Sequence, residues 1–555
     1  MSKLLARASR SLGRKAVVFN KQAFSYEQVL TAAETIRASL AKHLPGGSGA
    51  AGNGGGGPEQ PPRVGLFASP GPEYLAATWA VWQAGGIVVP LATSHPPPEL
   101  DYVCRDAGVA AVLAPPDQET RLGPITRRAG AALQLLEPLT GGTPEQPRGR
   151  GQGGAAGASG PGAGSGELSA ADAADLADLG SSSGRGALII YTSGTTGKPK
   201  GVLHSHRSLH AQEPCTPRSL HAQVASLASA WRWAPSDRLL HCLPLHHIHG
   251  IVNGLYCPAA VGAAVEFAPK FSPQAVWARL ESGDVSVFMG VPTMYSYLLA
   301  QYDAAGLGPS GPERQAAMRA AAAGLRLTVS GSSACPVPIM NSWKELSGSY
   351  LLERYGMTEI GMALSNPYEG ERRPGSVGQP LPAVEVRLAG DGQLLVRGPA
   401  VFGQYWGRPE ATAEAFDAEG YFLTGDTASV SGSPPYWAIE GRTSVDILKS
   451  GGYKISALQI ESAILEHPGV GEVAVLGVPD QALGEAVTAL LAPKPGPDGP
   501  GPRPSDAELG AFCRERLAPY QVPRRWHWVS ALPRNAMGKV NKKELLRLYT
   551  AGQLA

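Results

Sequence analysis

Short apolar runs that end at glycine-containing turns and lead into helical patterns recur along most of the chain. They are RVGLFA (63–68), GGIVVPL (85–91), AAVLA (110–114), ALIIY (187–191), LRLTVS (325–330) and YLLERY (350–355). Strands that alternate with helices form a mainly parallel sheet covered by helices. We therefore predict an α/β fold, with ligands at the carboxyl ends of these strands.

The pattern changes after residue 394. The runs LLVRG, YFLTGD and YWAIEGR are short and joined by turns, which predicts a small antiparallel β unit. A compact α+β pattern of roughly a hundred residues follows Gly441, a normal size for a separate domain. We expect a large N-terminal domain at 1–441 and a small, mobile C-terminal domain at 442–555. Two segments rich in Gly without hydrophobic periodicity, near 46–62 and 141–186, predict flexible surface insertions.

Charge and cysteine content exclude several classes of protein. Basic residues (48) nearly balance acidic ones (46), which argues against a nucleic-acid-binding surface. The six cysteines form no CxxC pair. We therefore expect a protein of a reducing compartment without a disulfide scaffold. The apolar stretches are interrupted by His, Pro or charge, so no membrane span is expected. Nothing in the sequence indicates an oligomeric state.

The N-terminus is basic before its first acidic residue, Glu27. A short organelle transit peptide has this character, and so does a plain basic surface. We expect an intracellular protein, in the cytoplasm or in an organelle such as the mitochondrion or plastid. Directly afterwards, AVVFN (16–20) predicts a strand and SYEQVL (25–30) a helix.

The string YTSGTTGKPKGV (191–202) directly follows an apolar run. Glycine frees backbone N–H groups to approach phosphate oxygens closely, and hydroxyls and ammonium groups add donors. The GxxxxGK[ST] spacing of a Walker A loop is missing. The string resembles the phosphate loop of the adenylate-forming enzymes, which include acyl- and aryl-CoA synthetases. The resemblance implies a catalytic role for Thr195 and ATP binding by Ser193, Gly194, Thr195, Thr196, Gly197, Lys198 and Lys200.

Other motifs of that family follow in the same order, and the resemblance covers about residues 16–545. YGMTE (355–359) is similar to the YGxTE motif, which implies that Tyr355 stacks on adenine and Thr358 lies near the phosphates. Glu359 would act in catalysis and help to hold Mg²⁺, for which carboxylate oxygen is a suitable ligand. The same resemblance implies that ATP also contacts Gly356, Met357, Gly331, Ser332 and Ser333.

Two further motifs lie near the boundary of the expected domains. Thr424-Gly425-Asp426 resembles the TGD motif, which implies that Asp426 accepts hydrogen bonds from the ribose hydroxyls. Gly441-Arg442 resembles the Gly-Arg near the family's hinge, which implies that Arg442 lies at the ribose or the phosphates.

The C-terminal domain contributes to both half-reactions in this family. PRNAMGK (533–539) resembles the catalytic lysine motif. The Lys539 ammonium would bind ATP and donate to the substrate carboxylate and the α-phosphate as charge develops. The turn in ILKSGGYKIS resembles the one that lines the pantetheine tunnel, which implies that Lys449, Gly451 and Gly452 bind coenzyme A. ATP, Mg²⁺ and coenzyme A are therefore the expected cofactors.

Polar residues at the expected acyl site indicate a small dicarboxylic acid. Arg354 stands where many relatives carry glycine, and strand alternation places it on the opposite face from Tyr355. Guanidinium is the best bidentate partner for carboxylate. His247 matches a histidine widespread in the family and is a catalytic candidate. His249 and Ser330 would complete a pocket with Arg354 for a second carboxylate. These segments together resemble malonyl-CoA synthetases.

Alternatives to these roles remain open. Arg354 could pair with Glu353 instead of substrate. The histidines, with Cys242, could form a metal site, although no second ligand group has matching spacing. The resemblance implies an AMP-forming ligase that converts malonate or methylmalonate to its CoA thioester through an acyl-adenylate. The alternative functions are a short- or medium-chain acyl-CoA synthetase and a non-catalytic nucleotide-binding homologue.

Overall fold

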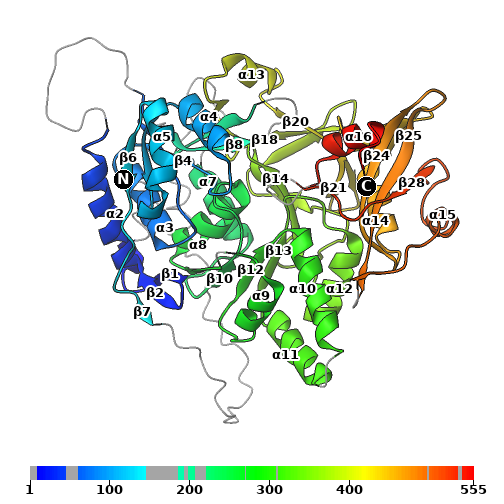
Figure 1. The fold of residues 1–555 in the computed structure, drawn as a ribbon, viewed down its shortest axis with the longest axis horizontal. Coiled ribbons are helices and arrows are strands. Elements are labelled where there is room, and N and C mark those ends of the chain that lie inside the picture. Colours follow the sequence, from blue (N-terminus) through cyan, green and yellow to red (C-terminus); the bar gives the residue numbers. More distant parts are fainter. Residues whose placement is uncertain are drawn as a thin grey trace.

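The computed structural model describes residues 9–44, 60–144, 186–192, 198–206, 220–268, 270–307, 310–496, 499–534 and 540–554. Two large sheets form the body of the molecule. A C-terminal domain, orange and red in Figure 1, lies at the opposite end from the N-terminus, and a small four-stranded sheet lies between it and the large sheets. The predicted organisation, a large α/β N-terminal part followed by a small α+β domain, is confirmed.

The first large sheet has seven strands in the order β19-β9-β8-β4-β3-β5-β6. The strands from β8 to β6 are parallel, whereas β9 pairs antiparallel with β8, and β19 with β9. Their bounds are β3 (Arg63–Leu66), β4 (Ile87–Pro90), β5 (Val109–Ala114), β6 (Ala132–Leu135), β8 (Gly186–Thr192), β9 (Lys200–Ser205) and β19 (Gln404–Tyr405). The connecting helices are α3 (Pro72–Gln83), α4 (Pro97–Ala107), η2 (Pro116–Gln118) and α5 (Glu119–Ala129).

The second large sheet has ten strands in the order β16-β15-β14-β13-β12-β10-β11-β1-β2-β7. Its six central strands, from β14 to β1, are parallel. The bounds are β1 (Lys15–Phe19), β2 (Gln22–Ser25), β7 (Thr143–Pro144), β10 (Arg238–His241), β11 (Ala264–Phe267), β12 (Val287–Gly290), β13 (Leu327–Ser330), β14 (Leu352–Met357), β15 (Gly361–Ser365) and β16 (Gln379–Pro380).

Helices pack between the two sheets and on the outer face of the second. The inner group shares one apolar core with strands of both sheets and comprises α2 (Tyr26–Leu40), α3, α7 (Leu220–Ala230), the π-helix η3 (His249–Tyr256) and α8 (Cys257–Val261). A second core lies under the outer group, which comprises α9 (Pro273–Leu280), α10 (Pro292–Ala305), α11 (Gly311–Ala323) and α12 (Val337–Ser347). A short helix, η1 (Ser9–Ser11), precedes β1. No helix in the described ranges has both the length and the apolar character needed to cross a bilayer.

The predicted antiparallel β unit is a four-stranded sheet in the order β17-β18-β20-β21. Its strands are β17 (Glu385–Leu388), β18 (Gln393–Arg397), β20 (Phe422–Ser431) and β21 (Tyr436–Arg442), and α13 (Pro409–Glu414) precedes β20. Together with the β14–β15 hairpin it builds a core of its own, which fixes β20 and β21 beside the end of β14.

The C-terminal domain has a sheet in the order β23-β22-β25-β24, with β28 parallel to β25. Its elements are β22 (Ile447–Ser450), β23 (Tyr453–Ser456), α14 (Ala457–Ile464), β24 (Val470–Asp480), β25 (Gly484–Pro493), β26 (Pro495–Gly496), β27 (Gly499–Pro500), α15 (Asp506–Arg514), β28 (Arg525–Trp528) and α16 (Lys542–Thr550). Lys454 Nζ donates to the backbone oxygen of Asp391, 3.2 Å away in the β17–β18 turn, so the domain contacts the small sheet.

Candidate active site

Three predicted nucleotide-binding side chains meet at one point. The Tyr355 hydroxyl donates a hydrogen bond of 2.5 Å to Oδ2 of Asp426, and Nε of Arg442 lies 2.8 Å from Oδ1 of the same carboxylate. Tyr355 comes from β14, whereas Asp426 and Arg442 face each other in register on β20 and β21. Burial, reinforced by the Asp426 carboxylate, raises the pKa of Tyr355 far above its ordinary value, so the phenol remains a donor.

The Thr424-Gly425-Asp426 turn is held by its own hydrogen bonds. The Thr424 hydroxyl donates to the backbone oxygen of Leu394 at 2.6 Å, and the Asp426 N–H donates to that hydroxyl at 3.1 Å. Gly425 adopts a φ of +70°, which few other residues tolerate. These contacts hold the backbone of Asp426 in place, and its side chain is buried.

The turn after β14 carries the YGMTE motif. A Cβ at Gly356 would lie 2.0 Å from the carbonyl oxygen of Gly361, so only glycine fits this tight hairpin. Buried His204 hydrogen-bonds the backbone of Thr358, and burial lowers the pKa of this histidine to about 4. The motif's backbone is therefore braced by β9, the strand that leaves the phosphate loop.

Glu359 presents a partly buried carboxylate at the same turn. The Tyr405 hydroxyl donates to its Oε1 at 3.0 Å, and burial raises the pKa of Glu359. A single carboxylate beside the phosphate loop fits a magnesium ion, which usually takes one or two protein carboxylates and completes its shell with phosphates and water. Glu359 is the described residue that would hold such an ion.

Residues 193–197 of the phosphate loop lie outside the described residues, and so do the predictions for Ser193, Gly194, Thr195, Thr196 and Gly197. Both ends of the loop are fixed by α4. The Tyr102 hydroxyl donates to the backbone oxygen of Pro199 at 2.8 Å, and the Tyr191 hydroxyl donates to Oδ2 of Asp106 at 2.8 Å. Because Tyr102 and Asp106 are four residues apart, they share one face of the helix.

The loop's lysines lie over aromatic rings. Lys198 Nζ is 5.6 Å from the centroid of the Tyr102 ring, and Lys200 Nζ is 5.0 Å from that of Tyr405. Tyr405 therefore contacts both Lys200 and Glu359. No sequence motif indicates Tyr102, Asp106 or Tyr405, because their roles depend on contacts between distant segments.

Arg354 is buried on the face of β14 opposite Tyr355. A Cβ at Gly331 would lie 2.6 Å from its Cζ, so the guanidinium packs directly on the glycine backbone. Its Nε and Nη2 have no hydrogen-bond partner within the described residues. The neighbouring Glu353 instead accepts the backbone N–H of Cys335 at 2.7 Å. Burial lowers the pKa of Arg354 and raises that of Glu353 to about 8.

His249, the first residue of η3, lies beside the loop on which Arg354 packs. Its Nδ1 lies 3.1 Å from the hydroxyl of Ser332, a residue with an unusual φ of +71°. Ser330 is fully buried at the end of β13, opposite Glu353 in register. The structure thus brings Arg354, His249 and Ser330 to neighbouring positions, while Ser332 lies between them. Ser333 follows it in the same loop.

His246 and His247 precede η3. The ring centroids of these two histidines are 4.1 Å apart, and His246 lies edge-on to His95 at 5.6 Å. Burial lowers the pKa of His246 to about 4. Within the described residues no group of three or more His, Cys, Asp or Glu side chains has the geometry of a metal site. The catalytic role of His247 stays a prediction.

The predicted coenzyme A turn is a tight β22–β23 hairpin. Gly451 and Gly452 form its tip with φ values of +57° and +85°, as a type I′ turn requires. Lys449 lies before the tip, paired in register with Lys454. Lys539 lies outside the described residues. Three residues beyond it, Lys542 places its buried ammonium 2.6 Å from carboxylates of both Asp446 and Glu461.

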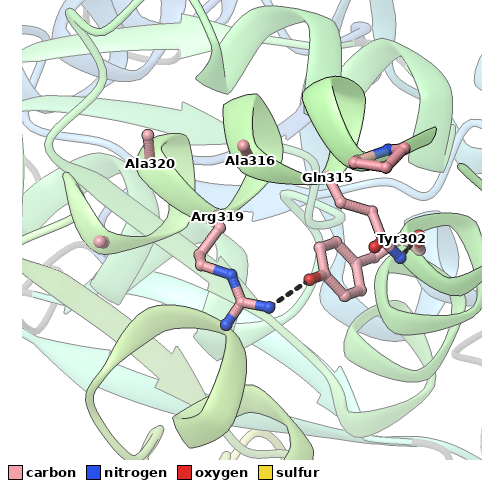
Figure 2. A pocket seen from close by; sticks show the side chains of 7 residues that line it. Tyr302, Gln315, Ala316, Arg319 and Ala320 are labelled. Atoms are coloured by element: carbon pink, nitrogen blue, oxygen red, sulfur yellow. Dashed lines mark hydrogen bonds between the residues drawn. The ribbon is translucent and has the colours of Figure 1, made fainter. Parts of the chain in front are cut away.

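A cavity of about 450 Å³ lies elsewhere, between α10 and α11. Figure 2 shows the Arg319 guanidinium pointing toward the Tyr302 hydroxyl, to which its Nη2 donates at 2.6 Å. Alanine side chains form much of the remaining wall. None of the residues that the sequence identified as functional lines this cavity.

Comparison with known proteins identifies the family. The AMP-binding enzyme family matches residues 4–406, and the AMP-binding enzyme C-terminal domain matches residues 459–539. The chain is 40% identical to a malonate–CoA ligase of Arabidopsis thaliana, over 97% of this chain and 86% of that one. It is 43% identical to the mitochondrial malonate–CoA ligase ACSF3 of Mus musculus, over 89% of this chain and 83% of that one.

Solved structures show the same architecture. ATP-bound MatB from Rhodopseudomonas palustris is 30% identical with a TM-score of 0.78, and the match covers 100% of this chain and 99% of that one. A malonyl-CoA ligase with bound methylmalonyl-CoA and AMP is 34% identical with a TM-score of 0.61, over 96% and 100%. The chain therefore belongs to the AMP-binding acyl-CoA synthetase superfamily and is an ATP-dependent, AMP-forming acid–thiol ligase.

Proposed function

We propose that this enzyme activates malonate, and methylmalonate as a close analogue, to the corresponding CoA thioester. The observation that carries the proposal is the buried Arg354 guanidinium, whose Nε and Nη2 are without partners in the described part of the chain. A buried cation without a partner is costly, and a second substrate carboxylate would supply two acceptors. The named activities of the relatives and of the ligand-bound structures support the same acid class.

In the first half-reaction, a carboxylate oxygen of the acid attacks the α-phosphorus of ATP and pyrophosphate leaves. Asp426 would accept the ribose hydroxyls, and the loop at 193–200 would bind the phosphates through its N–H, hydroxyl and ammonium groups. Lys539 would donate to the attacking carboxylate and the α-phosphate. A magnesium ion held by Glu359 would neutralise phosphate charge.

In the second half-reaction, the CoA thiol attacks the acyl carbon of the adenylate, the thiol proton is lost, and AMP leaves. We propose that residues 442–555 rotate as a mobile lid about a hinge near Arg442. Rotation would replace Lys539 by the hairpin that carries Lys449, Gly451 and Gly452. Covalent activation thus divides one difficult condensation into two easier displacements.

An acid panel measured by AMP release tests the substrate. We expect malonate to give the highest kcat/KM, and Arg354→Gly to abolish this preference while leaving activity with propionate within a few-fold. Arg354→Lys is the matched control, because it keeps the charge but loses the planar fork. Equal malonate turnover by wild type and Arg354→Gly would refute the dicarboxylate proposal and favour a short-chain acyl-CoA synthetase.

A second experiment separates the half-reactions. Lys539→Ala should abolish malonate-dependent pyrophosphate exchange but retain thioester formation from pre-made malonyl-adenylate and CoA. Equal loss in both assays would refute the assignment of Lys539 to the first step. A complete lack of malonate-dependent exchange in the wild type would instead refute malonate as the acid and favour another acid of the panel.

The compartment is a separate proposal. The mouse relative carries the description mitochondrial, and the basic N-terminal residues fit import into an organelle. We propose an organellar location. Imaging of a C-terminal fluorescent fusion should show it in mitochondria or plastids, and a diffuse cytoplasmic signal would refute it.

A further inference from the structure

Two buried carboxamides lie on neighbouring helices, one of which packs against β15 of the β14–β15 hairpin. Gln223 of α7 and Asn253 of η3 are 1% and 0% exposed. For each of them, neither the amide nitrogen nor the amide oxygen has a hydrogen-bond partner within the described residues. Proteins rarely bury a primary amide in this way, because the lost hydration is not replaced. Such amides are usually hydrogen-bonded to a ligand or to an ordered water.

The position of Gln223 relates it to the β14–β15 hairpin. A Cβ at Gly361 would lie 2.4 Å from its Nε2, so the carboxamide rests directly on the Gly361 backbone. Gly361 pairs in register with Met357, and the turn between these two residues carries Glu359. The Gln223 amide therefore lies beside the end of the YGMTE turn, at Gly361.

The position of Asn253 relates it to His249. These residues are four apart on η3, and a π-helix has about 4.4 residues per turn, so their side chains project from the same face. His249 uses this face to contact Ser332. The helix η3 packs against α7, and α7 packs against β15. The two amides therefore lie on neighbouring helices, Gln223 at the β14–β15 hairpin and Asn253 on the helix face that contacts the Ser330–Ser333 loop through His249. Arg354 packs on that loop at Gly331.

We propose that Asn253 and Gln223 are specificity-determining residues that bind the end of the acid remote from the reacting carboxylate, directly or through one water. This inference rests on the proposed function, because it assumes that the acid lies beside Arg354. The ligand class is a short acid with an oxygen acceptor at its far end, to which each amide donates an N–H. An apolar acid would leave both amides unpartnered, which provides discrimination beyond that of Arg354.

Asn253→Leu and Gln223→Met test the proposal, since each change keeps the volume and removes the amide. We expect the ratio of kcat/KM for malonate over propionate to fall by about tenfold or more in each variant, as for loss of a hydrogen bond to a charged group. The 3-hydroxypropionate to butyrate ratio should fall as well. The melting temperature should stay equal or rise, because an unpartnered polar group has been removed from the interior.

Asn366→Leu is the matched control for stability. This buried amide is fully partnered: its Nδ2 donates to backbone oxygens of Glu353 and Ser376 at 3.1 and 2.6 Å, and its Oδ1 accepts from Arg373. Its removal should lower the melting temperature. A lower melting temperature and equal loss with all acids in the Asn253 and Gln223 variants would overturn the proposal, and so would unchanged acid ratios.

The same panel distinguishes this failure from that of the proposed function. A wild-type enzyme that does not use malonate refutes the malonate assignment alone. The ratio of 3-hydroxypropionate to butyrate then decides whether the amides recognise a polar end. Unchanged ratios in an enzyme that does use malonate refute the role of the amides alone.

Discussion

The hydroxyl of Tyr355 donates to the carboxylate of Asp426 at 2.5 Å, so the residue expected to cover adenine also orients the residue expected to hold the ribose. Asp426→Ala should therefore raise the KM for ATP by roughly 10- to 100-fold, as for loss of hydrogen bonds to a charged group. Tyr355→Phe keeps the ring and should raise it by only about fivefold. Pyrophosphate exchange at varied ATP concentration measures the KM of both variants. An equal rise in KM for Asp426→Ala and Tyr355→Phe would contradict the smaller, orienting role of the Tyr355 hydroxyl.

The hydrogen bond from Tyr102 to Pro199 gives a prediction for the phosphate loop. Tyr102→Phe frees one end of the loop and should raise the KM for ATP by about fivefold, the loss expected for one neutral hydrogen bond. Thioester formation from pre-made adenylate should be unaffected, because it needs no β- or γ-phosphate. Tyr302→Phe, which also loses a hydroxyl hydrogen bond but at a remote surface, should leave both reactions unchanged. A defect in the second reaction would indicate general damage.

Glu353 should make stability depend on pH. Its pKa is raised from 4.5 to about 8 by burial. Between these values the folded state holds one more proton than the unfolded chain, so the free energy of unfolding falls as pH rises. The contribution is full below pH 4.5 and is lost as pH passes 8. Glu353→Gln should reduce the slope by on the order of 1 kcal/mol per pH unit. Urea titrations at pH 5, 6, 7 and 8 measure it, and identical slopes would contradict the prediction.

The buried Lys542 gives a prediction for the C-terminal domain. Burial opposes its charge, but Glu461 and Asp446 outweigh this, and its pKa is raised. Lys542→Met would leave two carboxylates buried without a cation. We expect it to destabilise this domain by about 3–5 kcal/mol. Its exposed neighbour supplies the control, since Lys543→Met should change stability by less than about 0.5 kcal/mol. Chemical denaturation followed by the tryptophans of β28 measures the free energy of unfolding of both variants. Similar losses of stability in the two variants would contradict the role of the buried Lys542 with its two carboxylates.

Much of the fold follows from local patterns. The parallel strands β1, β3, β4, β5, β8, β13 and β14 were predicted because each is a short apolar run before a helical pattern, and β18, β20 and β21 because they are short runs joined by turns. The parallel strands β6, β10, β11 and β12 were not predicted. The β1–β2 hairpin was missed. Its turn residues, Asn20 and Lys21, both have positive φ, and Lys has no preference for that conformation. Without the turn signal, residues 22–25 resemble the lead-in to a helix.

The site could be predicted only where a motif spans consecutive residues. Tyr355, Asp426 and Arg442 belong to such motifs, and the structure brings them together. Asp106 and Arg408 form an ion pair across 302 positions of the sequence, so no local pattern indicates it. The partners of Arg354 could not be settled from sequence either. Its neighbour Glu353 faces the opposite side of the strand, and which of two buried faces receives the acid depends on tertiary packing.

The two-residue strand β19 has a consequence for how this chain can be divided. It covers the outer edge of β9, although nearly two hundred residues separate them in sequence. A fragment ending before Gln404 would leave that edge with exposed N–H and C=O groups, which readily recruit another chain. Such a fragment should self-associate. During synthesis, the ribosome must therefore release the chain beyond Tyr405 before this edge of the seven-stranded sheet is protected from aggregation.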